Sequence, residues 1–396
     1  MKSKVAIVRD VDIEERTRRA VELIGGIEKT VGRGDEVLIK PNMVGGFPSE
    51  TGETTDPEFV RVIVEMAFEA GAKKVLVGEG EPFVSMEELK RRFVNRAIPS
   101  TEPLHTRYKR ILKKTGGKLI DFNADRWETV KVPNPVFFDK IQVARAVLDC
   151  DVLIGAPVLK THHLAGITVA LKNLYGVIPR SDKGRYHRLD RVEEAIIDIN
   201  KVRTCDMVIV DGTRTILHWG RIDEYLETKQ LNLTLAGFDP VAIDAVSAKI
   251  LGINPESLRF LIWAEEHKLG TADLNRIETV GITIEEAYRG KMMTSVEYVN
   301  RKFSKIHLLN CGACTGCFGR IATALNRIDD SGMKEDAYIF MGPDVRSIKE
   351  KGKVFLCGNC AAPTIYNKRK GIFIPGCPPD LRPLLDEIKK IGALIK

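Results

Sequence analysis

Six of the eight cysteines in this chain follow residue 310, and their close spacing is typical of ligands for a soft metal. Thiolates bind iron and zinc well, and cysteines a few residues apart can present several sulfurs from one loop. No secretion signal precedes them, so metal ligation is expected in place of a disulfide framework. Cys150 and Cys205 stand alone, where a small buried side chain is the expected role. The sequence therefore predicts a metal centre drawn from Cys311, Cys314, Cys317, Cys357, Cys360 and Cys377.

The first three of these cysteines share one short segment, CGACTGC, at residues 311–317. Their C-x2-C-x2-C spacing is the one that bacterial ferredoxins use to hold an iron-sulfur cluster. The fourth cysteine and the proline of that pattern are missing, because FGRI follows at residues 318–321. At least one further ligand must therefore come from another part of the chain.

Two later segments carry a more specific resemblance. GNCA at residues 358–361 and PGCPP at 375–379 resemble the segments that hold the 4Fe-4S cluster in nickel-iron hydrogenase small subunits and in the related subunit of respiratory complex I. The resemblance covers about 25 residues and implies that Cys360 and Cys377 are ligands. Two more would come from the CGACTGC segment, with Cys357 beside the site. A structural zinc site of four thiolates is the alternative, and two clusters would need ligands other than cysteine.

A second group of residues has the chemistry of an anion site. Lys40 ends the run EVLIK and Asn42 follows it, whereas Lys160, His162 and His163 follow the run DVLIG. We expect Lys172 and Asn173 on a helix that begins near Gly166 and points unpaired amides at a ligand. Lysines and helix amides bind carboxylates or phosphates, and a histidine can transfer a proton. Solvated surface lysines and non-ligating histidines are the alternative interpretation.

The same motifs resemble the domain of unknown function 362 family. The resemblance rests on KPNMV, GAPVLKTHHLAGITVALKNLYGVIP and GFDPVAIDAVSA, and it covers roughly residues 35–250. It implies an α/β fold, often accompanied by iron-sulfur segments, but no general activity. The motif positions that it marks are Lys40, Asn42, Lys160, Thr161, His162, Thr168, Lys172, Asn173, Asp239 and Asp244.

From these motifs we predict two sets of site residues, besides the six cysteines. Asp211 joins them because IVDGTR places it at another strand end, whereas Asp239 is a candidate helix cap and Asp244 either a cap or a ligand. The segment RSDKGRYHR at residues 180–188 is expected to be a mobile basic loop, either a solvated turn or a loop whose Arg185 and His187 close over an anion. The predicted catalytic residues are Lys160, His162, His163 and Lys172, and the predicted substrate-binding residues are Lys40, Asn42, Thr161, Thr168, Asn173, Asp211 and Asp244.

Short β-branched runs alternate with helical spacing through the first 300 residues, which predicts a mainly parallel sheet covered by helices. The expected strands are VAIV, EVLIK, KVLVG, DVLIG and MVIVD, and Asp-Pro pairs at 56–57 and 239–240 predict helix starts. Residues 81–135 break the alternation, so we expect an insertion that forms a lid. Residues 301–396 form a smaller cysteine-rich α/β domain, with strands at 305–309, 337–342, 353–358 and 371–376 and a closing helix at about 379–390.

Composition excludes several classes of function. The 396 residues carry 61 basic and 54 acidic side chains that are dispersed along the chain, so a small anionic substrate is favoured over nucleic acid. No apolar run is long enough for a membrane span, and a cytoplasmic protein is expected. Glutamine occurs only at positions 142 and 230, a bias typical of proteins from hot environments.

Three hypotheses for function follow from these patterns. The first is an iron-sulfur enzyme, an oxidoreductase or a lyase, that acts on a small anionic metabolite with a 4Fe-4S cluster as its cofactor. The second is a protein that carries clusters or electrons to a partner protein without catalysis. The third is an anion-binding module stabilised by zinc.

Overall fold

The computed structural model describes most of the chain, and every structural statement below refers to that part. The described residues are 2–80, 102–162, 165–189, 191–216, 228–290, 295–311, 313, 317, 321, 324–325, 328–343, 345, 348–361, 371–377 and 379–395.

The first 290 residues form a lobe around an eight-stranded sheet with the order β12-β1-β11-β10-β7-β2-β3-β4. The strands β10, β7, β2, β3 and β4 run parallel to one another, and only β11 runs antiparallel to its neighbours. The five runs read as strands from the sequence are all strands, so the predicted mainly parallel sheet is confirmed. The bounds are β1 Ser3–Arg9, β2 Glu36–Pro41, β3 Lys74–Glu79, β4 Lys118–Asp121, β7 Val152–Ala156, β10 Met207–Ile216, β11 Thr228–Gly237 and β12 Ile277–Gly281.

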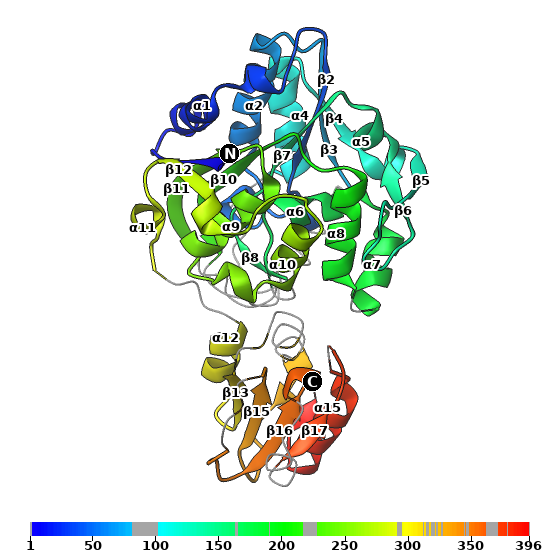
Figure 1. The fold of residues 1–396 in the computed structure, drawn as a ribbon, viewed down its shortest axis with the longest axis vertical. Helices are drawn as coiled ribbons and strands as arrows, with labels where there is room; N and C mark the ends of the chain where they lie inside the picture. Colours follow the sequence, from blue (N-terminus) through cyan, green and yellow to red (C-terminus); the bar gives the residue numbers. More distant parts are fainter. Residues whose placement is uncertain are drawn as a thin grey trace.

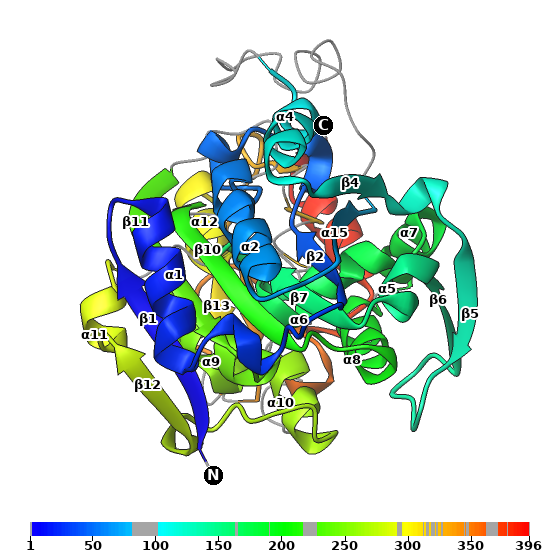
Figure 2. The ribbon, with the colours of Figure 1, turned by 90° about the horizontal axis from the view of Figure 1, so that it is seen from above.

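Helices cover both faces of this sheet (Figures 1 and 2). The helices α1, α2 and α4 contribute buried residues to one apolar core, and α6, α8, α9 and α10 contribute to the core on the opposite face. Asp56 and Asp239 cap α2 and α9 as their Asp-Pro pairs predict. The bounds are α1 Ile13–Ile24, α2 Pro57–Glu69, α4 Leu104–Thr115, α5 Arg145–Asp149, α6 Ala170–Asn173, α7 Arg180–Arg188, α8 Val192–Val202, α9 Pro240–Ile250, α10 Arg259–Glu266 and α11 Ile284–Ala287.

Two small hairpins lie beside the main sheet. The strands β5 (Trp127–Lys131) and β6 (Lys140–Ala144) form one, and β8 (Thr161–His162) and β9 (Gly166–Ile167) form the other. The second hairpin directly follows β7 and carries several of the predicted site residues.

The smaller lobe is built on a parallel four-stranded sheet with the order β13-β15-β16-β17 (Figure 1). Its apolar core includes Val299 and Phe303 from the α12 segment and Leu384 and Ile388 from α15. The bounds are β13 Ile306–Asn310, β15 Ala337–Met341, β16 Lys353–Cys357, β17 Ile372–Ile374, α12 Ser295–Lys302 and α15 Leu381–Lys390, and β14 (Ile328–Asp329) pairs with β18 (Leu394–Ile395).

The described residues also bear on two expectations about organisation. The described part of the expected insertion, residues 102–135, joins the main lobe, because β4 pairs with β3 and α4 buries Leu104, Tyr108 and Leu112 against the core. The smaller lobe also begins before residue 301, since the α12 segment packs into its core.

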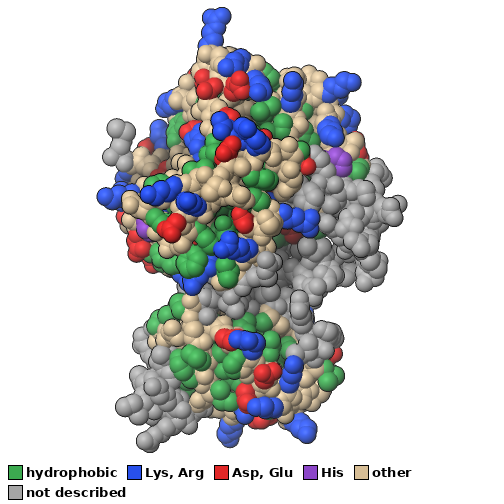
Figure 3. Space-filling view, turned by 90° about the vertical axis from the view of Figure 1, so that its right-hand side faces the viewer, with side chains coloured by type: hydrophobic (Ala, Val, Ile, Leu, Met, Phe, Trp, Pro, Cys, Tyr) green, Lys and Arg blue, Asp and Glu red, His purple; other side chains and the backbone are tan. Residues whose placement is uncertain are grey.

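The charge distribution on one face and the lengths of the helices were expected to limit the kinds of partner. On the face drawn in Figure 3, lysine and arginine side chains are interspersed with acidic ones across the larger lobe. Within the described residues, no helix combines the length and the apolar character that a membrane crossing requires.

Candidate functional site

A pocket of about 270 Å³ opens where the parallel strands β7, β2 and β3 end. The carboxyl ends of neighbouring parallel strands meet at one edge of a sheet, where α/β proteins place their ligands. Most of the residues that line the pocket come from these strand ends and from the segment between β8 and α7. They are Lys40, Asn42, Val44, Glu79, Lys160, His162, Thr168, Lys172, Asn173, Tyr175, Gly176 and Lys183.

The floor of the pocket contains a buried ion pair between neighbouring strands. The ammonium group of Lys40, in β2, contacts the carboxylate of Glu79, which ends β3. Only 1% of the Lys40 side chain and 3% of the Glu79 side chain are exposed. The Lys40 Nζ also donates to the carbonyl oxygen of Pro41 at 2.7 Å, and Glu79 Oε1 accepts from the Gly80 amide at 2.9 Å. Such extra hydrogen bonds are what a buried pair needs to offset the loss of water around two charges.

A second ion pair forms one wall. Lys160 Nζ lies 2.7 Å from Glu53 Oε2 and donates to the Glu53 carbonyl oxygen at 2.6 Å. The loop that carries Glu53 is anchored to the sheet, because Thr55 Oγ1 donates to the carbonyl oxygen of Ala156 at the end of β7. Both pairs hold a lysine in one orientation at the pocket, so little rotamer freedom is left to lose when a ligand binds.

The segment that carries Lys172 and Asn173 differs from the sequence expectation. We expected a helix from Gly166, but Gly166 lies in β9 with a φ of +77°, and α6 spans only Ala170–Asn173. Its first amides are not available to a ligand. The amides of Ala170 and Leu171 donate to Asp244 Oδ1 and Oδ2 at 2.6 and 3.0 Å.

Asp244 is therefore a structural cap and not a ligand-binding residue, which corrects its predicted role. It lies in α9, is fully buried and does not line the pocket. Burial raises its pKa to about 7, and the two amides that its carboxylate accepts act in the opposite direction. By capping α6 it fixes the direction in which Lys172 and Asn173 leave the backbone.

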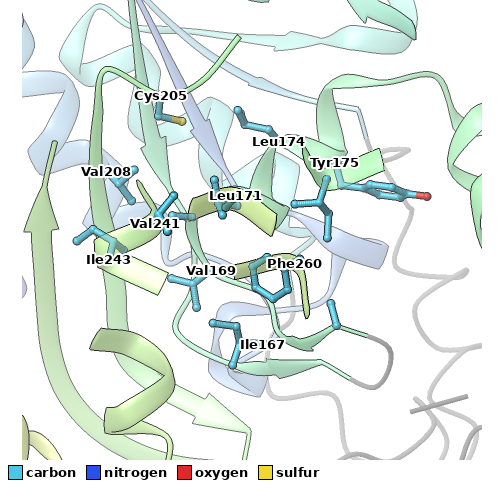
Figure 4. Close-up of a cluster of buried hydrophobic side chains, with 14 of the residues drawn as sticks. Ile167, Val169, Leu171, Leu174, Tyr175, Cys205, Val208, Val241, Ile243 and Phe260 are labelled. Atoms are coloured by element: carbon cyan, nitrogen blue, oxygen red, sulfur yellow. The ribbon is translucent and has the colours of Figure 1, made fainter. Parts of the chain in front are cut away.

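Apolar packing holds α6 in place beneath the pocket. Leu171 and Leu174 lie among buried residues of α9 and α10, including Val241, Ile243 and Phe260 (Figure 4). Each buried side chain of this size contributes about 1.5–3 kcal/mol to folding. The polar residues of the segment are thus carried on a rigid apolar base.

Three further pocket residues bring cationic or proton-transferring groups. Lys172 Nζ lies 5.2 Å from the centre of the Tyr175 ring, and Lys183 Nζ donates to the Gly80 carbonyl oxygen at 3.1 Å. The amide of Ala165 donates to His162 Nδ1 at 3.2 Å. Because Nδ1 acts as an acceptor, Nε2 carries the proton of the neutral ring.

The structure brings most of the predicted anion-site residues together. Lys160, His162, Lys172, Lys40, Asn42, Thr168 and Asn173 all line the pocket. Thr161 is buried and does not line it, and His163 lies outside the described residues. Their chemical roles stay predictions.

Asp211 is placed elsewhere, which corrects its predicted role in substrate binding. Its carboxylate accepts the Asp56 amide at 2.8 Å and the Thr213 amide at 2.9 Å, so it ties α2 to β10. Burial raises its pKa, and the nearby Asp56 charge raises it further.

Sequence reasoning missed Glu79 and Lys183. Glu79 directly follows the KVLVG run, so the rule that strand ends carry ligand residues would have found it. Lys183 lies in α7, in the segment that we expected to be a loop, and Arg185 of the same segment does not line the pocket. Nothing in the sequence distinguishes Lys183, which lines the pocket, from Arg185, which does not.

The described cysteines of the smaller lobe gather at the carboxyl edge of its sheet. Cys311 follows β13, Cys357 ends β16 and Cys377 follows β17. The turns of Cys360 and Cys377 are joined by hydrogen bonds from the Asn359 amide to the Gly376 carbonyl oxygen at 2.8 Å and from the Gly376 amide to Asn359 Oδ1 at 2.7 Å. Cys360 and Cys377 are exposed.

The remaining thiols are less accessible. Cys357 is fully buried in the apolar core, and burial raises the pKa of its thiol. Cys317 is also buried, and its Sγ lies close to Gly358, because a Cβ added there would be 2.8 Å from it. Cys357 therefore packs as a core residue, which argues against its predicted place in the ligand set.

The cysteines fit a thiolate-bound metal centre in type, but the described part does not assemble one. No group of three or more histidine, cysteine, aspartate or glutamate side chains in that part is arranged to hold a metal ion. Cys314 lies outside the described residues.

The larger lobe is similar to known proteins. The family described as "Domain of unknown function (DUF362)" matches residues 37–249. A thylakoid-associated protein of Synechocystis is 26% identical over 258 residues, which cover 64% of this chain and 74% of that protein.

A solved structure also resembles this chain weakly. The lactate racemase apoprotein of Thermoanaerobacterium thermosaccharolyticum has a TM-score of 0.37 and 14% sequence identity. The match covers 64% of this chain and 58% of the racemase chain. A likeness at this level carries no argument about function.

Substitution of Gly176 by alanine tests the packing of the pocket floor. A Cβ added there would lie 2.5 Å from Glu79 Oε1 and 2.6 Å from Lys40 Nζ. We expect Gly176→Ala to lower the free energy of unfolding by about 1–3 kcal/mol, because the buried ion pair cannot move without losing hydrogen bonds. Gly32→Ala, whose Cβ would have its nearest neighbour at 3.4 Å, is the control. Equal stability of the two variants in urea unfolding would contradict this description of the floor.

The raised pKa of Asp244 predicts that the stability of the protein depends on pH. Its pKa of about 7 in the folded protein exceeds the ordinary aspartate value of 3.8, so the folded state holds the proton more tightly than the unfolded state. The free energy of unfolding should therefore fall as the pH rises from about 4 to about 7, by at most about 1.4 kcal/mol per pH unit. Urea unfolding of the native protein and of Asp244→Asn across this range measures the difference. Identical pH dependence in both proteins would show that Asp244 titrates normally.

Proposed function

The chain belongs to the domain of unknown function 362 family, and on that premise we propose that it is an enzyme that binds a small anionic metabolite in the pocket between β7, β2 and β3. The observation that carries this proposal is the convergence of four lysines on one pocket. Lys40, Lys160, Lys172 and Lys183 reach it from separate segments of the chain.

Charge supports an anionic ligand. Among the described residues, four lysines line the pocket, and the carboxylates of Glu79 and Glu53 pair with two of them, Lys40 and Lys160. Buried lysines that repel one another persist where a ligand or a carboxylate compensates them. An anion that enters between them would gain charge-assisted hydrogen bonds.

His162 supports catalysis over binding alone. It lines the same pocket as the lysines, and its ring is oriented by the hydrogen bond from the Ala165 amide. In this proposal the lysines orient the anion, and His162 Nε2–H donates a hydrogen bond to the oxygen on which negative charge develops. Each of these steps uses only residues that line the pocket.

Lysine substitution tests the proposal. We expect Lys172→Met to weaken the binding of inorganic phosphate about 10- to 100-fold, because one charge-assisted hydrogen bond to an anion is worth about 1.5–3 kcal/mol. Isothermal titration calorimetry measures the affinity. Lys249→Met, at an exposed position of α9, is the matched control.

Equal affinities of the native protein and Lys172→Met would contradict the assignment of the pocket. So would a loss of affinity of the same size in Lys249→Met, because that result would indicate a general effect of surface charge.

We further propose that the smaller lobe holds an iron-sulfur cluster, with zinc as the alternative metal. The observation that favours a metal is the pair of exposed thiols, Cys360 and Cys377, on turns that hydrogen-bond to each other. Thiolates are the ligands that both iron-sulfur clusters and structural zinc use. Residues of the CGACTGC segment would supply the remaining ligands, and the bound cluster would supply electron transfer or Lewis acidity.

Serine substitution tests this second proposal. Cys360→Ser and Cys377→Ser should each lose bound iron and sulfide after anaerobic purification, because a serine oxygen is a poor substitute for thiolate. Cys150→Ser and Cys205→Ser are the controls, since both residues lie in the larger lobe and should leave the metal content unchanged. Stoichiometric zinc without iron in the native protein would favour the alternative, and normal iron content in Cys377→Ser would contradict the proposed ligand.

A further inference from the structure

Asn173 presents a buried hydrogen-bond acceptor at the pocket. The residue lines the pocket and is only 4% exposed. Its Nδ2 donates to the Lys40 carbonyl oxygen at 2.6 Å, which fixes the orientation of the amide because Oδ1 cannot donate. Its Oδ1 is buried and accepts no hydrogen bond from the described residues. The acceptor is therefore oriented, and that part of the chain gives it no donor.

The backbone that carries Asn173 is held in place, so the amide cannot turn freely toward another donor. The first amides of α6 donate to Asp244, and the Leu171 carbonyl oxygen accepts from Asn200 Nδ2 at 2.9 Å. A rotation of the Asn173 amide by half a turn would place Oδ1 against the Lys40 carbonyl oxygen, where two acceptors repel each other. The missing donor must come to Oδ1 where it lies.

A buried acceptor without a donor is unfavourable, because it has lost its hydrogen bonds to water and gained none in return. Native proteins rarely leave such atoms unpaired, and each case calls for an explanation. Oδ1 of Asn200 is also buried without a donor among the described residues, but Asn200 does not line the pocket. Of the two asparagines, only Asn173 lies where a molecule in the pocket can supply the donor.

The chemistry of the donor follows from the chemistry of oxyanions. The oxygens of a deprotonated carboxylate are acceptors only, whereas a protonated phosphate oxygen and the hydroxyl group of a hydroxycarboxylate each carry a hydrogen atom that can be donated. The lysines of the pocket cannot recognise such an O–H group, because an ammonium group has no acceptor atom. Oδ1 of Asn173 is suited to this task, since it is an acceptor with a fixed direction.

Building on the proposed anion site, we propose that the pocket selects oxyanions that carry an O–H group, and that this group donates its hydrogen bond to Asn173 Oδ1. A site built to hydrogen-bond a hydroxyl group rejects the analogue that lacks it, since the buried polar atom is then left unpaired. Asn173 is in this way a specificity-determining residue that acts through a hydrogen bond and carries no charge of its own.

Two ligand pairs, each matched in charge, test this inference. At pH 8.0 phosphate and phosphite are both mainly dianions, but phosphite has a P–H bond where phosphate has a P–OH group. Glycolate and propionate are both monoanions, with a hydroxyl group in one where the other has a methyl group. Calorimetry with the full-length native protein should show at least about fivefold tighter binding of the O–H compound in at least one pair. The pair that discriminates identifies the ligand class as a phosphate or a hydroxycarboxylate.

Two variants assign the discrimination to one residue. Asn173→Ala should bind the members of the discriminating pair with affinities within about twofold of each other, whereas Asn200→Ala should keep the native preference. Asn200 is the matched control because its Nδ2 also holds α6, through the Leu171 carbonyl oxygen, and its Oδ1 is also buried without a donor in the described part. A general displacement of α6 would therefore alter both variants.

A crystal structure of the native protein with the tighter-binding compound gives a second measurement, which decides even if Asn173→Ala does not fold. An oxygen of the ligand should lie about 2.5–3.0 Å from Asn173 Oδ1, a distance at which one of the two oxygens must carry a hydrogen atom. A ligand bound in the pocket without an oxygen at this distance would overturn the inference.

The binding results also separate this inference from the function on which it rests. Equal affinities within both pairs would overturn the role of Asn173 and leave the anion site standing. A native preference that persists in Asn173→Ala, or that is lost equally in Asn200→Ala, would overturn the role as well. If none of these compounds binds, the proposed function and this inference both fail.

Discussion

The buried ion pair between Lys40 and Glu79 is the interaction on which the geometry of the pocket depends. Each of these charges would be strongly unfavourable in the sheet without the other, and the effective cost of an unpaired buried charge is several kcal/mol. The pair joins the ends of β2 and β3, and Gly176 passes over it because it has no side chain. The Lys40 carbonyl oxygen then accepts from Asn173, so the same strand end orients the next layer of the pocket.

The other parts of the site are also held by contacts between segments that are far apart in the sequence. Asp244 uses both carboxylate oxygens to cap α6, and Leu171 packs that short helix onto the core. Glu53 holds Lys160 at the pocket wall through its side chain and its backbone. A ligand therefore meets charges that are already oriented, which lowers the entropy cost of binding and favours specific recognition over general attraction.

The sequence predicted the sheet and much of the pocket because both follow from one rule. Parallel strands end at the same edge, so Lys40 and Lys160, which follow two β-branched runs, were expected to lie close together. The helical segment was predicted wrongly because its amides are satisfied from a distant residue, Asp244, and pairing over such a separation leaves no local signal. Lys183 was missed because nothing in the sequence distinguishes it from Arg185 of the same segment, which does not line the pocket.

The cysteine-rich lobe shows a different limit of sequence reasoning. Spacing placed the thiols at one sheet edge, and the structure puts Cys311, Cys357 and Cys377 there. Spacing did not reveal that Cys357 packs into the core, because β16 is buried on both faces and its last residue lies in the same apolar cluster as Phe355. Composition alone cannot separate a ligand from a packed thiol.

The central claim is that the lysines around the pocket bind one small anion. Crystals soaked in arsenate, with diffraction data recorded at the arsenic absorption edge, test it most directly, because the anomalous signal locates the anion without reference to activity. The account predicts one strong peak inside the pocket, within hydrogen-bonding distance of the ammonium groups of at least two of Lys40, Lys160, Lys172 and Lys183. A pocket without an arsenic peak, in crystals that show ordered arsenate elsewhere, would contradict it.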